Sequence, residues 1–126
     1  MNQSNRPVFL NLFRIRFPVT AILSILHRVT GVLMVLSMPG LFYLFGLSLS
    51  SQQGWDETLS LMSHPLSKIA IALFIWGLVH HLFAGIRFLF IDIEWGVDKI
   101  TARASAWLVN IASVLVAALI AWRFLL

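Results

Sequence analysis

The stretch AILSILHRVTGVLMVLSMPGLFYLFGLS, residues 21–48, decides the class of fold to which this chain belongs. Its only charged side chain is Arg28, and it is longer than the roughly 20 apolar residues that a helix needs to cross a bilayer. Backbone N–H and C=O groups find no water inside lipid, so we expect this stretch to be a transmembrane helix. Pro39 lies inside it and predicts a kink, or a helix end followed by a looser tail.

Two further segments of the same kind follow, at about residues 66–90 and 104–126, and the connections at 50–64 and 91–103 are polar. The 126 residues are 60% hydrophobic and only 11% charged, with a mean hydropathy of +0.91. A water-soluble domain of this size needs more charge on its surface. We therefore predict an all-α membrane protein with three transmembrane helices, forming a single membrane-anchor domain over residues 1–126.

The basic residues predict the orientation of the spans. Several lie before the first span or in the second connection, namely Arg6, Arg14, Arg16, Lys99 and Arg103, whereas the first connection has none. The positive-inside rule then places the N-terminus and the second connection in the cytoplasm. These residues form no run, which argues against a nucleic-acid partner. The segment before Thr20 lacks the apolar core of a signal peptide, so we expect it to be retained.

The first span carries a polar face. Ser24, His27, Arg28 and Gly31 recur at i, i+3, i+4 and i+7, and successive residues of a helix step by about 100°. Arg28 lies roughly 12 Å along the helix from Thr20, near the limit from which an arginine reaches the headgroups. One alternative is that Arg28 does so and that His27 bonds a neighbouring helix. The other is that the guanidinium binds a carboxylate or a quinone carbonyl.

The second span places His81 between Gly77 and Gly85, at i−4 and i+4. Glycines at this spacing let another helix approach closely. They also leave room for a flat macrocycle whose iron the imidazole would ligate, and the central histidine favours this second interpretation. A haem on His81 would then present its propionates to His27 and Arg28, because both helices reach a comparable depth.

His80 points about 100° away from His81 and shares a face with Ala84 and Arg87, so we expect it to make a polar contact with a neighbouring helix. The third span contains no histidine or methionine, and the chain contains no cysteine. If both axial ligands of the haem came from this chain, they would have to be His81 with His27, or His81 with His80, which points in another direction. We therefore expect a second axial ligand from another polypeptide.

Two segments carry a family resemblance: RPVFLNLFRIRFPVTAILSILHRVTGV at residues 6–32 and HLFAGIRFLFID at residues 81–92. They resemble the cytochrome b membrane-anchor subunits of succinate dehydrogenase, respiratory Complex II, especially their proteobacterial form. The resemblance runs along nearly the whole chain, although elsewhere it consists mainly of hydropathy and span count. It implies a multi-pass location in the bacterial inner membrane, within the respiratory chain and the tricarboxylic acid cycle.

The resemblance also implies roles for individual residues. The H-x-x-x-G-[IV]-R segment supplies an axial ligand to haem b, here His81, and the S-x-x-[HR]-R segment borders the ubiquinone pocket, here Ser24 and Arg28. His27 and Arg28 would lie near the haem propionates. Asp92 is a candidate proton-path residue, although a helix-capping or ion-paired role fits its position equally well. One departure is Phe88, where family members often carry a histidine.

The implied partners are a second membrane-anchor protein, which completes a helical bundle around haem b and supplies its other histidine, together with an iron–sulfur subunit and a flavoprotein subunit. Two electrons would pass singly from an iron–sulfur cluster to ubiquinone, with protons drawn from the cytoplasmic side. Two alternatives stay open: a purely structural membrane anchor without haem, and the anchor of a quinol:fumarate reductase, which runs the same chemistry in reverse.

Overall fold

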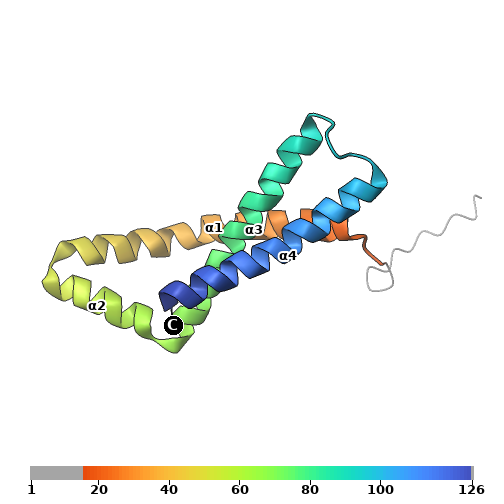
Figure 1. Ribbon diagram of the computed structural model, residues 1–126. Coiled ribbons are helices and arrows are strands. Elements are labelled where there is room, and N and C mark those ends of the chain that lie inside the picture. The colour runs from red at the N-terminus through yellow and green to blue at the C-terminus, as the bar shows by residue number, and fades with distance from the viewer. Residues whose placement is uncertain (1–15, 126) are drawn as a thin grey trace, which may run out of the picture.

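The computed structural model describes residues 16–125 and arranges them as four helices (Figure 1). Three of them, α1 (Val19–Ser50), α3 (Pro65–Asp92) and α4 (Lys99–Leu125), are long and apolar enough to cross a membrane. They contain the three predicted spans, apart from Leu126, and they confirm the all-α membrane class. Leu126, Arg6, Arg14 and the expectation of a retained N-terminus all lie outside the described residues.

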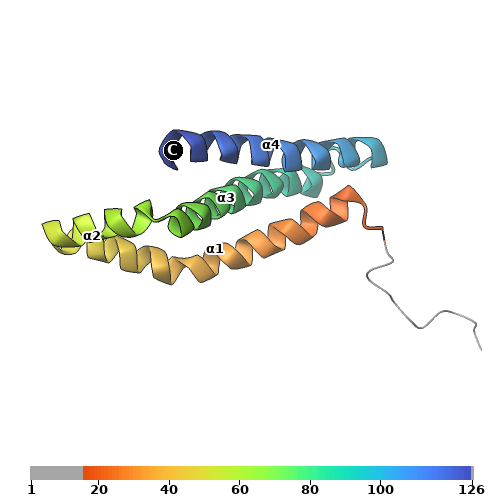
Figure 2. The same cartoon turned by 90° about the horizontal axis from the view of Figure 1, so that it is seen from below.

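The first helix begins directly after Pro18, whose carbonyl oxygen accepts hydrogen bonds from the backbone of Ala21 and Ile22 at 2.9 and 3.1 Å. It does not end at Pro39 but continues to Ser50. Figure 2 shows that α1 changes direction along its length, as a proline that removes one backbone hydrogen bond leads one to expect. Of the two outcomes predicted at Pro39, helix termination is therefore excluded.

The first connection differs from its prediction, because residues 52–63 form a further helix, α2 (Gln52–Ser63), which folds back beside the second half of α1 (Figure 1). Ser51 caps it by accepting a hydrogen bond from the backbone N–H of Gly54 at 3.0 Å. Thr58 and Gly54 are buried, and a methyl group at Gly54 would collide with the carbonyl oxygen of Leu47. Close backbone packing on α1 stabilises this short helix.

The three long helices pack with α3 between α1 and α4 (Figure 2). Small side chains lie at the buried contacts, among them Gly77 and Ala84 on α3 and Ala106, Ser113 and Ala117 on α4. Without a hydrophobic driving force between helices in lipid, close packing of such residues is what holds spans together. A small core forms near the start of α1, where Val19, Leu23, Ala84 and Ala106 meet.

A tight turn joins α3 to α4. Glu94 and Gly96 both adopt left-handed backbone conformations, with φ values of 60° and 75°, and the N–H of Trp95 donates to the carbonyl of Phe90 at 2.9 Å. Asp98 then caps α4 by accepting hydrogen bonds from the backbone N–H groups of Ile100 and Thr101 at 3.1 and 3.0 Å. The turn thus brings α4 back alongside α3.

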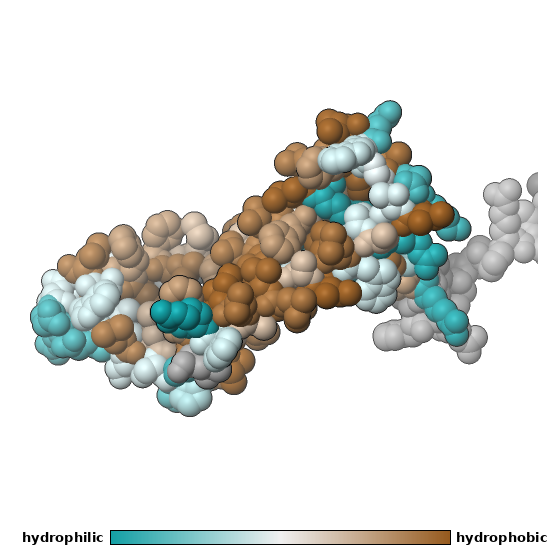
Figure 3. Space-filling model, viewed as in Figure 1, coloured by the Kyte–Doolittle hydropathy of each residue, from teal (hydrophilic) through white to brown (hydrophobic). Residues whose placement is uncertain are grey.

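The face of the molecule seen in Figure 3 is hydrophobic over the middle of the helices and hydrophilic toward both ends. Large apolar side chains of α1 are exposed, among them Val35, Leu36, Phe42 and Phe45. Contiguous apolar surface of this extent is compatible with lipid or with other transmembrane helices, and not with water.

Candidate functional site

Two histidines from different helices lie against each other at the α1–α3 interface. The imidazole rings of His27 on α1 and His81 on α3 are stacked, with centroids 4.1 Å apart and planes inclined by 14°. Phe88 packs edge-on against this pair, its ring centroid 5.1 Å from that of His27. The resemblance leads one to expect a histidine at position 88. In this chain the Phe88 ring lies there and fills the space beside His27.

The hydrogen bonds of His81 determine which of its nitrogens carries a proton. Its Nδ1 lies 3.0 Å from the carbonyl oxygen of His27 and 3.3 Å from the hydroxyl oxygen of Thr30. A carbonyl can only accept, so Nδ1 carries the hydrogen and donates it. With Nδ1 donating, Nε2 is the nitrogen left to bind a metal, in the manner of metal-bound histidines that donate through their other nitrogen.

Gly31 provides the space in which the His81 ring lies. A Cβ atom at residue 31 would lie 2.9 Å from Cε1 and 3.4 Å from Nδ1 of that ring. Thr30 is fully buried beside it, and its hydroxyl also donates to the backbone of Leu26 at 2.8 Å. Sequence reasoning placed Gly31 on the polar face but missed Thr30. The sequence did contain a signal for Thr30, because a threonine next to a glycine is unusual inside an otherwise apolar span.

The glycines that flank His81 on α3 face α1. A Cβ at Gly77 would lie 3.8 Å from the Thr30 methyl group, and one at Gly85 would lie 3.6 Å from Nε2 of His27. Both glycines therefore face α1, as the helix-packing alternative expects, and added Cβ atoms would make ordinary van der Waals contacts there. The strip cleared for a macrocycle stays a prediction.

The stacked geometry also bears on axial ligation. Two histidines that ligate one iron approach it from opposite sides of the porphyrin, whereas the rings of His27 and His81 are nearly parallel and in contact. No macrocycle fits between them. In this arrangement His27 does not pair with His81 across a porphyrin, and His80 bonds Asn110 on the other side of α3.

His80 makes the polar contact expected of it. It is 1% exposed, and its Nε2 donates to Oδ1 of Asn110 on α4 at 3.1 Å. The other two residues predicted on this face, Ala84 and Arg87, are buried as well. The side of α3 that carries His80 therefore packs on α4, while the side that carries His81 packs on α1.

The polar face predicted on the first span divides into two parts. His27 and Gly31 turn toward α3, whereas Arg28 is exposed and Ser24 is half-buried. Ser24 and Arg28 are one turn apart on α1, so they lie on the same side of that helix. Asp92 is the last residue of α3 and is exposed.

These features agree with what the chain is similar to. The family described as "Succinate dehydrogenase/Fumarate reductase transmembrane subunit" matches residues 2–120. Three relatives share the name "Succinate dehydrogenase cytochrome b556 subunit". That of Coxiella burnetii is 36% identical over 111 residues, which cover 87% of this chain and 89% of the relative. That of Paracoccus denitrificans is 29% identical over 94% of this chain and 92% of its own length.

The third relative, from Rickettsia prowazekii, is 31% identical over 93% of this chain and 91% of its own length. The resemblance seen in residues 6–32 and 81–92 is thereby confirmed across nearly the full chain, as is the prediction of a multi-pass protein of the bacterial inner membrane. A family match over residues 2–120, three helices able to span a membrane and relatives of nearly equal length agree: the chain belongs to the family of transmembrane subunits of succinate dehydrogenase and fumarate reductase.

Proposed function

We propose that this chain is the cytochrome b anchor subunit of a succinate dehydrogenase, in which His81 is an axial ligand of haem b and Ser24 with Arg28 binds ubiquinone. The observation that carries the proposal is the hydrogen bond from Nδ1 of His81 to the His27 carbonyl at 3.0 Å. It fixes the ring and leaves Nε2 as the coordinating nitrogen. The name shared by the relatives, cytochrome b556 subunit, supports a b-type haem here.

The residues present fit such a group. The imidazole of His81 donates through Nδ1, which leaves Nε2 for iron, and its stack with His27 supports a second ligand from a different polypeptide. We assign that ligand to a second membrane-anchor protein, which packs with this chain into a helical bundle around the haem. When bound, the haem supplies a one-electron redox centre next to the quinone site.

The quinone site uses the exposed part of the polar face. The hydroxyl of Ser24 donates a hydrogen bond to a quinone oxygen, and the guanidinium of Arg28 stabilises negative charge on the reduced quinone or on a haem propionate. His27 would lie near the propionates of a haem held by His81. Two electrons from the iron–sulfur subunit, itself bound to a flavoprotein subunit, and two protons convert ubiquinone to ubiquinol. This chain positions the quinone and does not itself oxidise succinate.

The orientation follows from the charges. The N-terminus and the α3–α4 turn, with Lys99 and Arg103 close to it, face the cytoplasm under the positive-inside rule. The quinone then approaches from the side on which the soluble subunits bind. Asp92, exposed at that end of α3, is a candidate entry point for protons drawn from the cytoplasm.

A His81→Ala substitution in the assembled complex tests the ligand, and His80→Ala is its matched control one residue away. We expect His81→Ala to abolish the b-type band in reduced-minus-oxidised spectra and to lower quinone reductase activity. His80→Ala should keep the band, because His80 bonds Asn110 and not the haem. An unchanged band in His81→Ala would contradict the assignment.

Two other functions make different predictions. A purely structural anchor predicts that the purified complex shows no b-type spectrum when reduced with dithionite. An anchor of a quinol:fumarate reductase predicts the same haem and quinone sites, with fumarate reduction by quinol favoured over succinate oxidation. The names of the three relatives favour the succinate-oxidising direction.

A further inference from the structure

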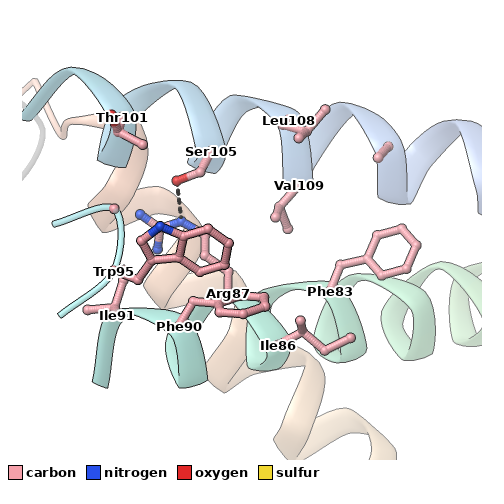
Figure 4. A pocket seen from close by; sticks show the side chains of 12 residues that line it. Phe83, Ile86, Arg87, Phe90, Ile91, Trp95, Thr101, Ser105, Leu108 and Val109 are labelled. Carbon is pink, nitrogen blue, oxygen red and sulfur yellow. Dashed lines mark hydrogen bonds between the residues drawn. The ribbon is translucent and has the colours of Figure 1, made fainter. Parts of the chain in front are cut away.

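A second polar feature of α3 lies away from the histidine pair, in a pocket of about 560 Å³ between α3 and α4. Figure 4 shows that it is bounded by both helices and by the turn that joins them. Its walls are mostly apolar and include Phe83, Ile86, Phe90, Leu108, Val109 and Ala112. This apolar lining extends over several turns of both helices and suits a hydrocarbon chain.

Among the described residues that line this pocket, Arg87 is the only charged side chain and none is a carboxylate. It is 8% exposed. Its Nε donates to the hydroxyl of Ser105 and its Nη2 to the carbonyl of Ala102, both at 2.9 Å (Figure 4 marks the first). Both acceptors are neutral, so these two bonds orient the guanidinium without compensating its charge.

A buried cation without an anionic partner is costly inside a membrane protein. An arginine has five N–H donors, and two of them are used in the bonds to Ser105 and Ala102. The remaining donors suit an anion with several oxygens, of which phosphate is the closest geometric match. Trp95, 66% exposed, lines the turn side of the pocket and belongs to the residue type that lies at headgroup level.

We propose that this pocket binds one anionic phospholipid, with its phosphate on Arg87 and an acyl chain along the apolar walls. Basic pockets between transmembrane helices can hold lipid headgroups, and charge complementarity selects an anionic lipid over a neutral one. The site is distinct from the proposed haem and quinone sites, because Arg87 faces α4 whereas His81 faces α1.

The test uses the purified complex that contains this chain, stripped of lipid and then titrated with phosphatidylglycerol or with phosphatidylcholine. Bound lipid is counted by native mass spectrometry, and the thermal midpoint is followed in parallel. Ala112→Phe fills the apolar part of the pocket without touching Arg87. Ala118→Phe, an exposed position on the same helix outside the lining, is the matched control.

We expect phosphatidylglycerol to bind about tenfold more tightly than phosphatidylcholine, because the choline cation of the latter already offsets the charge of its phosphate and weakens the attraction to Arg87. Ala112→Phe should abolish the bound lipid, whereas Ala118→Phe should bind as the unaltered chain does. Arg87→Gln should reduce the preference for the anionic lipid to about equal binding. If Arg87→Gln fails to assemble, the Ala112 and Ala118 pair decides the outcome.

Three results would overturn the proposal. Equal binding of the two lipids by the unaltered complex would show that the site does not select an anionic headgroup. Full retention of phosphatidylglycerol by Ala112→Phe would place the lipid elsewhere. Displacement of the lipid by inorganic phosphate at equal concentration would show that Arg87 binds a free anion and that the apolar walls contribute nothing.

Discussion

Nδ1 of His81 lies 3.0 Å from the carbonyl oxygen of His27, a residue 54 positions earlier in the chain. Because the acceptor is a backbone atom, the orientation of the imidazole depends on how closely α1 and α3 approach, and not on the side chain at residue 27. The distance between α1 and α3 depends in turn on small residues at their contact. Gly31 is the one that lies nearest to the imidazole ring. Helix packing therefore holds the nitrogen that we assign to the haem.

Gly31→Ala should displace the His81 ring, because the added Cβ would lie 2.9 Å from Cε1. Overpacking of this kind costs about 1–3 kcal/mol, and we expect a weaker b-type band with a lower thermal midpoint. Gly40→Ala, on the same helix with open space around it, is the control and should leave the band unchanged. Equal bands in the two variants would show that the ring is not confined by Gly31.

Ser24→Ala and Arg28→Leu should each weaken quinone binding while the haem band persists. Loss of a hydrogen bond to a charged group costs about 1.5–3 kcal/mol, so the KM for ubiquinone should rise about tenfold or more in Arg28→Leu. Ser24→Ala should have a smaller effect. The control is Ser37→Ala, since the Ser37 hydroxyl bonds the Met34 carbonyl of its own helix at 2.7 Å. Normal quinone kinetics in both variants would refute the assignment.

Asn110→Leu should destabilise the packing of α3 on α4. It leaves the Nε2 donor of the buried His80 without its acceptor at 3.1 Å, at a cost of about 1–2 kcal/mol. The double variant His80→Leu with Asn110→Leu should recover much of that loss, because both polar groups are then removed together. Thermal denaturation of the unaltered chain, the two single variants and the double variant measures the coupling, and strict additivity would contradict it.

Asp98→Ala should lower the thermal midpoint at neutral pH by removing the cap of α4. Hydrogen bonds from the side chain and then the backbone of Thr101 hold the pKa of Asp98 below its ordinary value of 3.8. A lowered folded-state pKa contributes stability above the unfolded pKa and loses it as the pH falls through the folded one. The difference in thermal midpoint between Asp98→Ala and the unaltered chain should therefore shrink as the pH drops below 3.8.

The matched control for that titration is Asp56→Ala, in the exposed first half of α2, where the carboxylate accepts one long bond from Gln52 at 3.3 Å. It should change the midpoint little at neutral pH, because this exposed carboxylate caps no helix. A difference at Asp98 that stays constant down to the acid limit would show that the carboxylate charge is not what caps α4.

Some elements of the fold were hidden from sequence reasoning for a physical reason. The helix α2 has only 12 residues, too few to be stable without packing, and its packing depends on the contact of Gly54 with α1. The neighbour that Gly77 and Gly85 face was hidden for a similar reason. A glycine strip has the same sequence pattern whether it faces a cofactor or another helix, and only the position of α1 distinguishes the two.

The sequence by itself determined the membrane class, the three spans and the separation of His80 from His81, because hydropathy and a 100° step per residue act locally along the chain. Only the tertiary structure decided which helix each histidine faces, which nitrogen of His81 carries the hydrogen, and that Thr30 and Gly31 hold its ring. Those outcomes depend on distances between helices, and such distances arise from packing among residues far apart in the sequence.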